Sequence, residues 1–174
     1  MPIGQDRRGA GGVGYLAGQY ELRRGRRIDP LDGEVGFLII GPDRSIEIPF
    51  PDRRVDYEGE VGVVVGRRAS RVSRSEAARY VFGYVPLLDI TMRGDEDRSY
   101  RKSFDTFTPI GPAIVTADEV PDPAAIQLEL TVNGETRQFA NTRDLIYDIP
   151  RQIEYLSTAF TLEPGDIIAT GTPE

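Results

Sequence analysis

The chain contains neither cysteine nor histidine. Without cysteine there is no disulfide, no thiolate nucleophile and no iron–sulfur or cysteine-based zinc site. Without histidine there is no Ser–His–Asp triad, no Cys–His pair and no imidazole to serve as a general base. A metal ion bound by this chain must therefore take oxygen ligands, which favours Mg²⁺, Mn²⁺ or Ca²⁺ over Zn²⁺.

Lysine is almost absent, because Lys102 is the only lysine among many arginines. A lysine ammonium is a compact charge whose pKa responds to burial, and arginine does not replace it in that respect. Lys102 is therefore either a chance survivor of an arginine-rich composition or a residue whose ammonium group is required.

Long apolar runs and excess positive charge are also missing. The net charge of −7 over 174 residues argues against a nucleic-acid-binding protein, since such binding depends on neutralising phosphates. No stretch approaches the roughly 20 apolar residues that a membrane-spanning helix needs, and the polar N-terminus lacks the apolar core of a signal peptide. We therefore expect a cytoplasmic protein with no membrane or nucleic-acid partner.

Three carboxylates stand out by their position. Residues 55–66 have the pattern of one strand, which places Glu58, Glu60 and Gly62 on one face and valines on the other. Crowded carboxylates raise each other's pKa unless a cation or water relieves them, and a glycine within a strand often marks the close approach of a ligand or backbone. Asp89 directly follows the apolar run 84–88 and is expected at the edge of a buried sheet. These acids either border solvent or converge as oxygen ligands of a hard divalent ion.

The remaining pattern predicts a β-rich α+β domain with a few short helices. Residues 1–32 are rich in glycine and arginine and form a poorly defined N-terminal segment, followed by the main domain at 33–174. The expected elements are strands at 36–40 and 45–48 about a turn at 41–43, a helix from the capping box 73–76 through Val81, a loop at 91–101, a hairpin about Asn133–Gly134, a helix after Asp148 whose core stripe is Ile149, Ile153, Leu156 and Phe160, and a strand at 167–169.

Seven sequence blocks follow the order and spacing of the fumarylacetoacetate hydrolase (FAH) family, and the chain resembles this family from about residue 33 to residue 173. The blocks are DYEGE (56–60), YVFGY (80–84), DITMR (89–93), KSFD (102–105), VNGE (132–135), NT (141–142) and LEPGDIIATGTP (162–173). The resemblance implies a mixed β-sandwich roll of the FAH type, usually in a homodimer.

The resemblance also implies a role for each matching residue. Metal ligation, usually of Mg²⁺, falls on Glu58, Glu60 and Asp89; the catalytic positions are Lys102 and Thr172; and the substrate-binding positions are Arg93, Gly171 and Thr172. The implied substrate is a small 1,3-dicarbonyl or 2-oxo acid, cleaved at a C–C bond by acylpyruvate-type hydrolysis or oxaloacetate-type decarboxylation. Two alternatives remain: an isomerase or tautomerase of a 2-hydroxymuconate-type diacid, whose second carboxylate Arg93 and the N-terminal arginines would hold, and a non-catalytic homologue that retains the metal site.

The chain departs from the family pattern near both of its ends. Hydrolases of the family carry a His-x-x-Glu pair that activates water, and an ungapped alignment places this pair at Tyr20 and Arg23. The missing pair shifts the expected chemistry toward decarboxylation and isomerisation, which need less help from a base. The sequence stops after the Thr-Gly-Thr-Pro block, where family members usually continue, so we expect either a short form or a domain that lacks the C-terminal strands.

Overall fold

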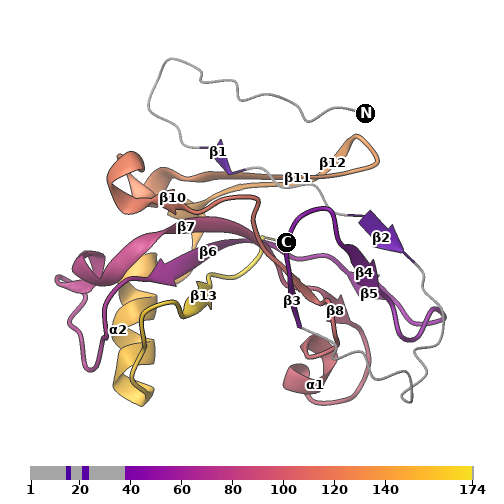
Figure 1. The fold of residues 1–174 in the computed structure, drawn as a ribbon, viewed down its shortest axis with the longest axis horizontal. Coiled ribbons are helices and arrows are strands. Elements are labelled where there is room, and N and C mark those ends of the chain that lie inside the picture. Colours follow the sequence, from indigo (N-terminus) through magenta and orange to yellow (C-terminus); the bar gives the residue numbers. More distant parts are fainter. Residues whose placement is uncertain (1–14, 17–20, 24–37, 174) are drawn as a thin grey trace.

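A computed structural model describes residues 15–16, 21–23 and 38–173, and the structural statements below concern these residues. The fold consists of many short strands and a few short helices, which confirms the predicted β-rich α+β class (Figure 1). Within these ranges no helix is long and apolar enough to cross a membrane.

The centre of the fold is a four-stranded antiparallel sheet in the order β10–β7–β6–β13. Its strands are β6 (Gly59–Val65), β7 (Val81–Leu88), β10 (Val115–Thr116) and β13 (Ile167–Ala169). Every residue of β6 is buried, so both of its faces are covered and not only the predicted valine face.

A second layer lies across the central strands and is formed by the predicted hairpin (Figure 1). The strands β11 (Gln127–Val132) and β12 (Glu135–Asn141) are antiparallel, and β1 (Tyr15–Leu16) pairs with β11 in parallel. Asn133 and Gly134 have φ angles of 54° and 83°, the left-handed conformation that a two-residue hairpin turn requires. The hairpin predicted about Asn133–Gly134 is therefore confirmed.

The helix α2 (Ile149–Ala159) covers the other end of the central sheet. The Asp148 side chain accepts a hydrogen bond from the Arg151 backbone N–H at 2.9 Å, as expected of an N-cap residue. Ile149 and Ile153 pack into the same core as the β6 valines. The prediction was wrong for Phe160, which follows the last helical turn and is 55% exposed.

The remaining strands form three two-stranded pairs around a second core that contains Ile46, Ile90 and Phe107. The parallel pairs are β2 (Glu21–Arg23) with β4 (Ser45–Glu47) and β3 (Ile39–Ile40) with β9 (Thr108–Pro109), and the antiparallel pair is β5 (Val55–Asp56) with β8 (Thr91–Met92). The strands on either side of the 41–43 turn therefore exist, but each pairs with a distant segment and not with the other.

Two predictions about helices need correction. The proposed capping box at 73–76 leads into only one 3₁₀ turn, η1 (Ala77–Tyr80), and Val81 already belongs to β7. The box does not form because the Glu76 carboxylate accepts a 2.6 Å bond from Arg79 and does not reach back to residue 73. The stretch 91–101, predicted as a loop, contains β8 and most of α1 (Arg98–Lys102), which the Asp97 side chain caps.

Three further 3₁₀ turns, η2 (Ala117–Glu119), η3 (Pro123–Ala125) and η4 (Thr142–Asp144), connect the strands. Most of the predicted N-terminal segment 1–32, including Tyr20, lies outside the described residues. Its boundary therefore stays a prediction.

Candidate metal centre

The three predicted carboxylates meet where the strand β6 begins beside the end of β7. The antiparallel register pairs Gly59 with Leu88, so Glu58 and Asp89 flank this pair, and the Asp89 backbone N–H donates to the Glu58 carbonyl at 2.8 Å. Glu60 lies two residues beyond Glu58 and projects to the same side, as strand alternation requires. Carboxylate oxygens of the three residues all lie within 4.8 Å of one another.

Glu60 is the most buried of the three acids, with 3% of the residue exposed. Burial, reinforced by the negative charges of Asp89 and Glu58, raises the pKa of Glu60 to about 7. The Gly171 backbone N–H and the Lys102 ammonium oppose this rise but do not cancel it. The positive charge near Glu60 therefore compensates only in part for its burial and for the neighbouring carboxylates.

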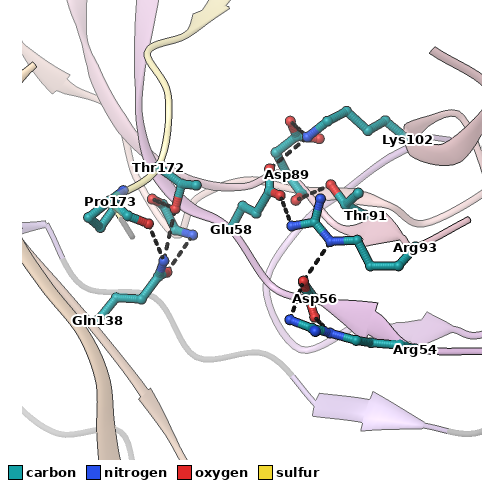
Figure 2. A network of polar contacts seen from close by, with 11 residues as sticks. Arg54, Asp56, Glu58, Asp89, Thr91, Arg93, Lys102, Gln138, Thr172 and Pro173 are labelled. Atoms are coloured by element: carbon teal, nitrogen blue, oxygen red, sulfur yellow. Dashed lines mark hydrogen bonds and ion pairs between the residues drawn. The ribbon is translucent and has the colours of Figure 1, made fainter. Parts of the chain in front are cut away.

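Lys102 supplies the nearest positive charge from the last turn of α1. Its Nζ donates to Glu58 Oε2 at 2.7 Å and also to Asp89 Oδ2 (Figure 2). Burial alone would lower the pKa of Lys102, but the hydrogen bonds with these two carboxylates raise it further, so the net pKa lies above its ordinary value. The sequence prediction that Lys102 accompanies the carboxylates agrees with this geometry.

Arg93 is held by two carboxylates at the opposite side of Glu58. Its Nη2 donates to Glu58 Oε1 at 2.9 Å and its Nε donates to Asp56 Oδ2 at 2.6 Å (Figure 2). Burial raises the pKa of Asp56, but hydrogen bonds from Arg54 and Arg93 outweigh it and leave that pKa below its usual range. Arg93 thus orients Glu58 in this structure, and the role of Asp56 was not recognised in the sequence.

The segment 170–173 that follows β13 closes the cluster along the edge of β6. Gly171 has a φ angle of 100°, which favours glycine, and its backbone N–H donates to Glu60 Oε2 at 2.8 Å. Thr170 Oγ1 donates to the Val61 carbonyl at 2.8 Å, and Thr172 Oγ1 donates to the Gly59 carbonyl at 3.0 Å. These bonds distinguish the segment from a plain surface turn.

Gln138 of β12 links this segment to the start of β6. Its Oε1 accepts from the Gly59 backbone N–H at 2.8 Å, and its Nε2 donates to Thr172 Oγ1 at 2.9 Å (Figure 2). Nothing in the local sequence singles out this glutamine, because its role depends on how the β11–β12 layer lies over β6.

Gly62 marks the close approach of a neighbouring strand and not of a ligand, which are the two alternatives that the sequence left open. A Cβ atom at this position would lie 2.8 Å from Val85 Cγ1 and 3.1 Å from Ile167 Cγ2. The neighbouring strands β7 and β13 fill the space, so the glycine serves the packing of the sheet and not the site.

The donor set of the cluster fits a hard divalent cation. Glu58, Glu60 and Asp89 offer only oxygen atoms and form the one such acidic group found within the described part of the chain. Carboxylate oxygens are the ligands that Mg²⁺, Mn²⁺ and Ca²⁺ take in proteins. An ion between the three carboxylates would compete with Lys102 for two of them.

The structure combines a strand-rich α+β fold with a cluster of oxygen ligands and an adjacent lysine. These features place the chain among candidate metal-binding proteins. Residues 37–174 match the family described as fumarylacetoacetate (FAA) hydrolase C-terminal. The chain therefore belongs to the fumarylacetoacetate hydrolase family.

Individual relatives agree with this assignment. The maleylpyruvate hydrolase of Aquipseudomonas alcaligenes is 45% identical over 136 residues, covering 78% of this chain and 47% of the relative. The crystal structure of maleylpyruvate hydrolase from Sphingobium sp. SYK-6 with manganese(II) ion and pyruvate is 47% identical, with a TM-score of 0.75 over 79% of this chain and 51% of that one. The structure of 5-carboxymethyl-2-hydroxymuconate delta-isomerase from Mycobacterium smegmatis is 40% identical, with a TM-score of 0.74 over 79% and 55% of the two chains. The chain thus spans about half the length of these relatives.

Proposed function

We propose that this protein is a divalent-metal-dependent enzyme that hydrolyses a C–C bond in an acylpyruvate-type substrate, which is both a 1,3-dicarbonyl compound and a 2-oxo acid. The observation that carries the proposal is the convergence of Glu58, Glu60 and Asp89 beside Lys102. The relatives named as maleylpyruvate hydrolases, one of them bound to Mn²⁺ and pyruvate, support this reaction class.

In this proposal the three carboxylates hold Mg²⁺ or Mn²⁺. A bound divalent ion acts as a Lewis acid toward the substrate's oxo and carboxylate oxygens. The chain's own contribution is to fix the ligands: Gly171 orients Glu60, Arg93 orients Glu58, and the β6–β7 register places Asp89 next to Glu58.

Hydrolysis adds the oxygen of water to the acyl carbon, breaks the bond between that carbon and the pyruvate methylene group, and leaves the electron pair on pyruvate as an enolate. Lys102 carries the ammonium closest to the carboxylate cluster and is protonated at neutral pH, so it stabilises the developing negative charge. Thr172 and the backbone near Gly171 lie beside Glu60 and position the substrate carboxylate. The attacking water gives up one proton as its OH joins the acyl carbon, and the enolate takes up one proton to give pyruvate, so the two steps balance.

A second reaction type is favoured by one feature of the composition. The chain has no histidine, so the proton of an attacking water cannot go to an imidazole. Isomerisation of a 2-hydroxymuconate-type diacid and decarboxylation of an oxaloacetate-type substrate use no attacking water. The likeness to the Mycobacterium smegmatis isomerase supports the first of these. The homodimer and the cytoplasmic location expected from the sequence stay predictions.

The metal assignment is tested by titrating chelator-treated protein with Mn²⁺ in a calorimeter. Glu58→Ala is expected to lose measurable binding while its circular dichroism spectrum stays unchanged. Glu135→Ala, a change of the same kind at an exposed position, is the matched control and should bind Mn²⁺ as the wild type does. Binding retained by Glu58→Ala would refute the assignment.

The reaction is tested by incubating the Mn²⁺-loaded protein with acetylpyruvate, oxaloacetate and a 2-hydroxymuconate-type diacid. Release of pyruvate and acetate from acetylpyruvate is the expected result. Turnover of only one of the other two compounds would assign decarboxylation or isomerisation instead. No turnover of any of them, with metal binding intact, would favour a non-catalytic homologue.

A further inference from the structure

A cavity of about 670 Å³ adjoins the carboxylate cluster at Gly171. This segment forms one wall, the residues 144–147 line another part, and Val61 and Leu128 contribute apolar surface. Gly171 connects the carboxylate cluster with the cavity, because its backbone N–H donates to Glu60 and the residue also lines the cavity. The volume falls within the range of roughly 300–1,000 Å³ that is typical of small-molecule sites.

Arg98 also lines this cavity and comes from the helix that carries Lys102. The two residues are four positions apart, so they lie on the same face of α1, one turn from each other. Lys102 reaches the carboxylate cluster, and Arg98 lies on the cavity at the next turn. One face of α1 therefore brings Lys102 to the carboxylate cluster and Arg98 to the cavity.

The guanidinium of Arg98 is uncommitted, unlike those of its neighbours. Its side chain makes no hydrogen bond or ion pair with any residue in the described ranges. Arg93, by contrast, is held by Asp56 and Glu58, and the Arg101 Nε donates to the Glu96 carbonyl at 2.9 Å. Arg98 is therefore the arginine of this region that is available to a ligand.

We propose that Arg98 binds a second, distal carboxylate of the substrate, so that the enzyme selects dicarboxylic 2-oxo acids over those with an uncharged tail. The inference rests on the proposed function, which places the 2-oxo acid end of the substrate at the carboxylate cluster. The carbon chain then extends past Gly171 into the cavity, and its terminal carboxylate pairs with the guanidinium in the bidentate geometry that arginine favours. In this proposal Arg98 takes the role that the isomerase alternative of the sequence analysis gives to Arg93 and the N-terminal arginines.

The charges around the cavity fix the end at which this carboxylate binds. Among the described lining residues only Arg98 and Asp144 are charged, and they do not pair with each other. Asp144 lies on η4 and repels a carboxylate, so the distal group binds at the α1 end. The apolar lining at Val61 and Leu128 suits the uncharged carbon chain between the two ends of the ligand.

The test compares two non-cleavable ligands that differ only in the distal group. The Mn²⁺-loaded full chain is titrated by calorimetry with 2-oxoadipate and with 2-oxohexanoate, which have six carbons each and end in a carboxylate and a methyl group. The wild type is expected to bind 2-oxoadipate roughly tenfold more tightly or better, as a charge-assisted hydrogen-bonded pair provides. Arg98→Gln should lose this preference and bind 2-oxohexanoate within twofold of the wild type. Arg98→Lys should keep part of the preference, and Arg101→Gln, the same change on the same helix, should keep all of it.

Each other outcome has a definite meaning. A wild type without preference, or Arg98→Gln with the preference intact, overturns the role of Arg98 and leaves the proposed function standing. Equal weakening of both ligands in Arg98→Gln also overturns it, because the residue would then only support α1. If neither ligand binds to the metal-loaded wild type, the 2-oxo acid site itself is refuted and this inference falls with it.

Discussion

Glu60 is expected to destabilise the metal-free protein, and its replacement by glutamine should reveal the size of the effect. Its carboxyl group is buried beside two other acids, which raises its pKa from 4.5 to about 7. A raised pKa in an acid means that folding favours the protonated form. The destabilisation is therefore absent well below pH 4.5, grows as the pH rises from 4.5 to about 7, and is complete above that range.

The magnitude follows from the two pKa values. The difference between 4.5 and about 7 corresponds to about 3 kcal/mol of lost stability at pH 8, at 1.36 kcal/mol per pKa unit. At pH 5 the loss is under about 1 kcal/mol, because the folded state then keeps the proton. Glutamine is uncharged, and its amide oxygen can still accept the N–H of Gly171. Glu60→Gln should therefore raise the melting temperature at pH 8 by roughly 6–12 °C and change it much less at pH 5.

The assay is thermal unfolding followed by circular dichroism, in chelator and then in excess Mn²⁺, at both pH values. In Mn²⁺ the order should reverse at pH 8, because the wild type gains the free energy of metal binding and the variant loses a ligand. Glu135→Gln, at an exposed position, is the control and should leave the melting temperature unchanged at both pH values. An equal shift of Glu60→Gln at pH 5 and pH 8, or none at pH 8, would refute the reasoning.

Four further predictions concern other parts of the structure. Lys102→Arg keeps the charge but not the compact ammonium, so kcat should fall roughly a hundredfold. Unchanged turnover would mean that the ammonium is not required and that Lys102 is a chance survivor of the arginine-rich composition. Metal binding should lower the pKa of Lys102, because the ion takes the carboxylate oxygens that raise it; since this is the only lysine, ¹³C NMR of lysine-labelled protein reports it as a single signal. Gly171→Ala should cost about 1–3 kcal/mol of backbone strain at a φ of 100° and weaken Mn²⁺ binding, measured by calorimetry, although no atom lies within 4 Å of the added Cβ. In urea unfolding, Ile153→Ala should cost about 2–5 kcal/mol, whereas Phe160→Ala, at a 55% exposed position, should cost under about 1 kcal/mol.

The carboxylate cluster could be predicted because its geometry follows from local rules. Alternation along a strand places Glu58 and Glu60 on one side, and the end of an apolar run places Asp89 at the edge of a sheet. The β6–β7 register then brings Asp89 next to Glu58 and Glu60. The same rules could not decide between a ligand and a backbone beside Gly62, because its neighbours Val85 and Ile167 come from other strands.

The rest of the site depends on contacts between segments that are far apart in the sequence. Gln138 is an ordinary polar residue in its own strand and gains its role only because β12 lies over Gly59 and Thr172. The helix α1 is only five residues long and lacks an apolar stripe, so the sequence could not show that Arg98 and Lys102 share one of its faces. The pairing of short strands is equally hard to predict from the sequence. The strands β3 and β4 flank one turn, but β3 pairs with β9 and β4 pairs with β2.

The position of Lys102 links the stability of the cluster to its proposed chemistry. In the metal-free protein three carboxylates share one ammonium and the guanidinium of Arg93, which leaves the cluster one positive charge short of neutral if all three are ionised. A divalent ion held by the three carboxylates would more than offset that shortage, and because it would compete for the oxygens of Glu58 and Asp89, it would also release the ammonium of Lys102 from them. The released ammonium would then be available to the negative charge that develops on the substrate. The same carboxylates that destabilise the empty cluster would thus hold Lys102 in place until the metal arrives, so metal binding has to precede the contact between Lys102 and the substrate.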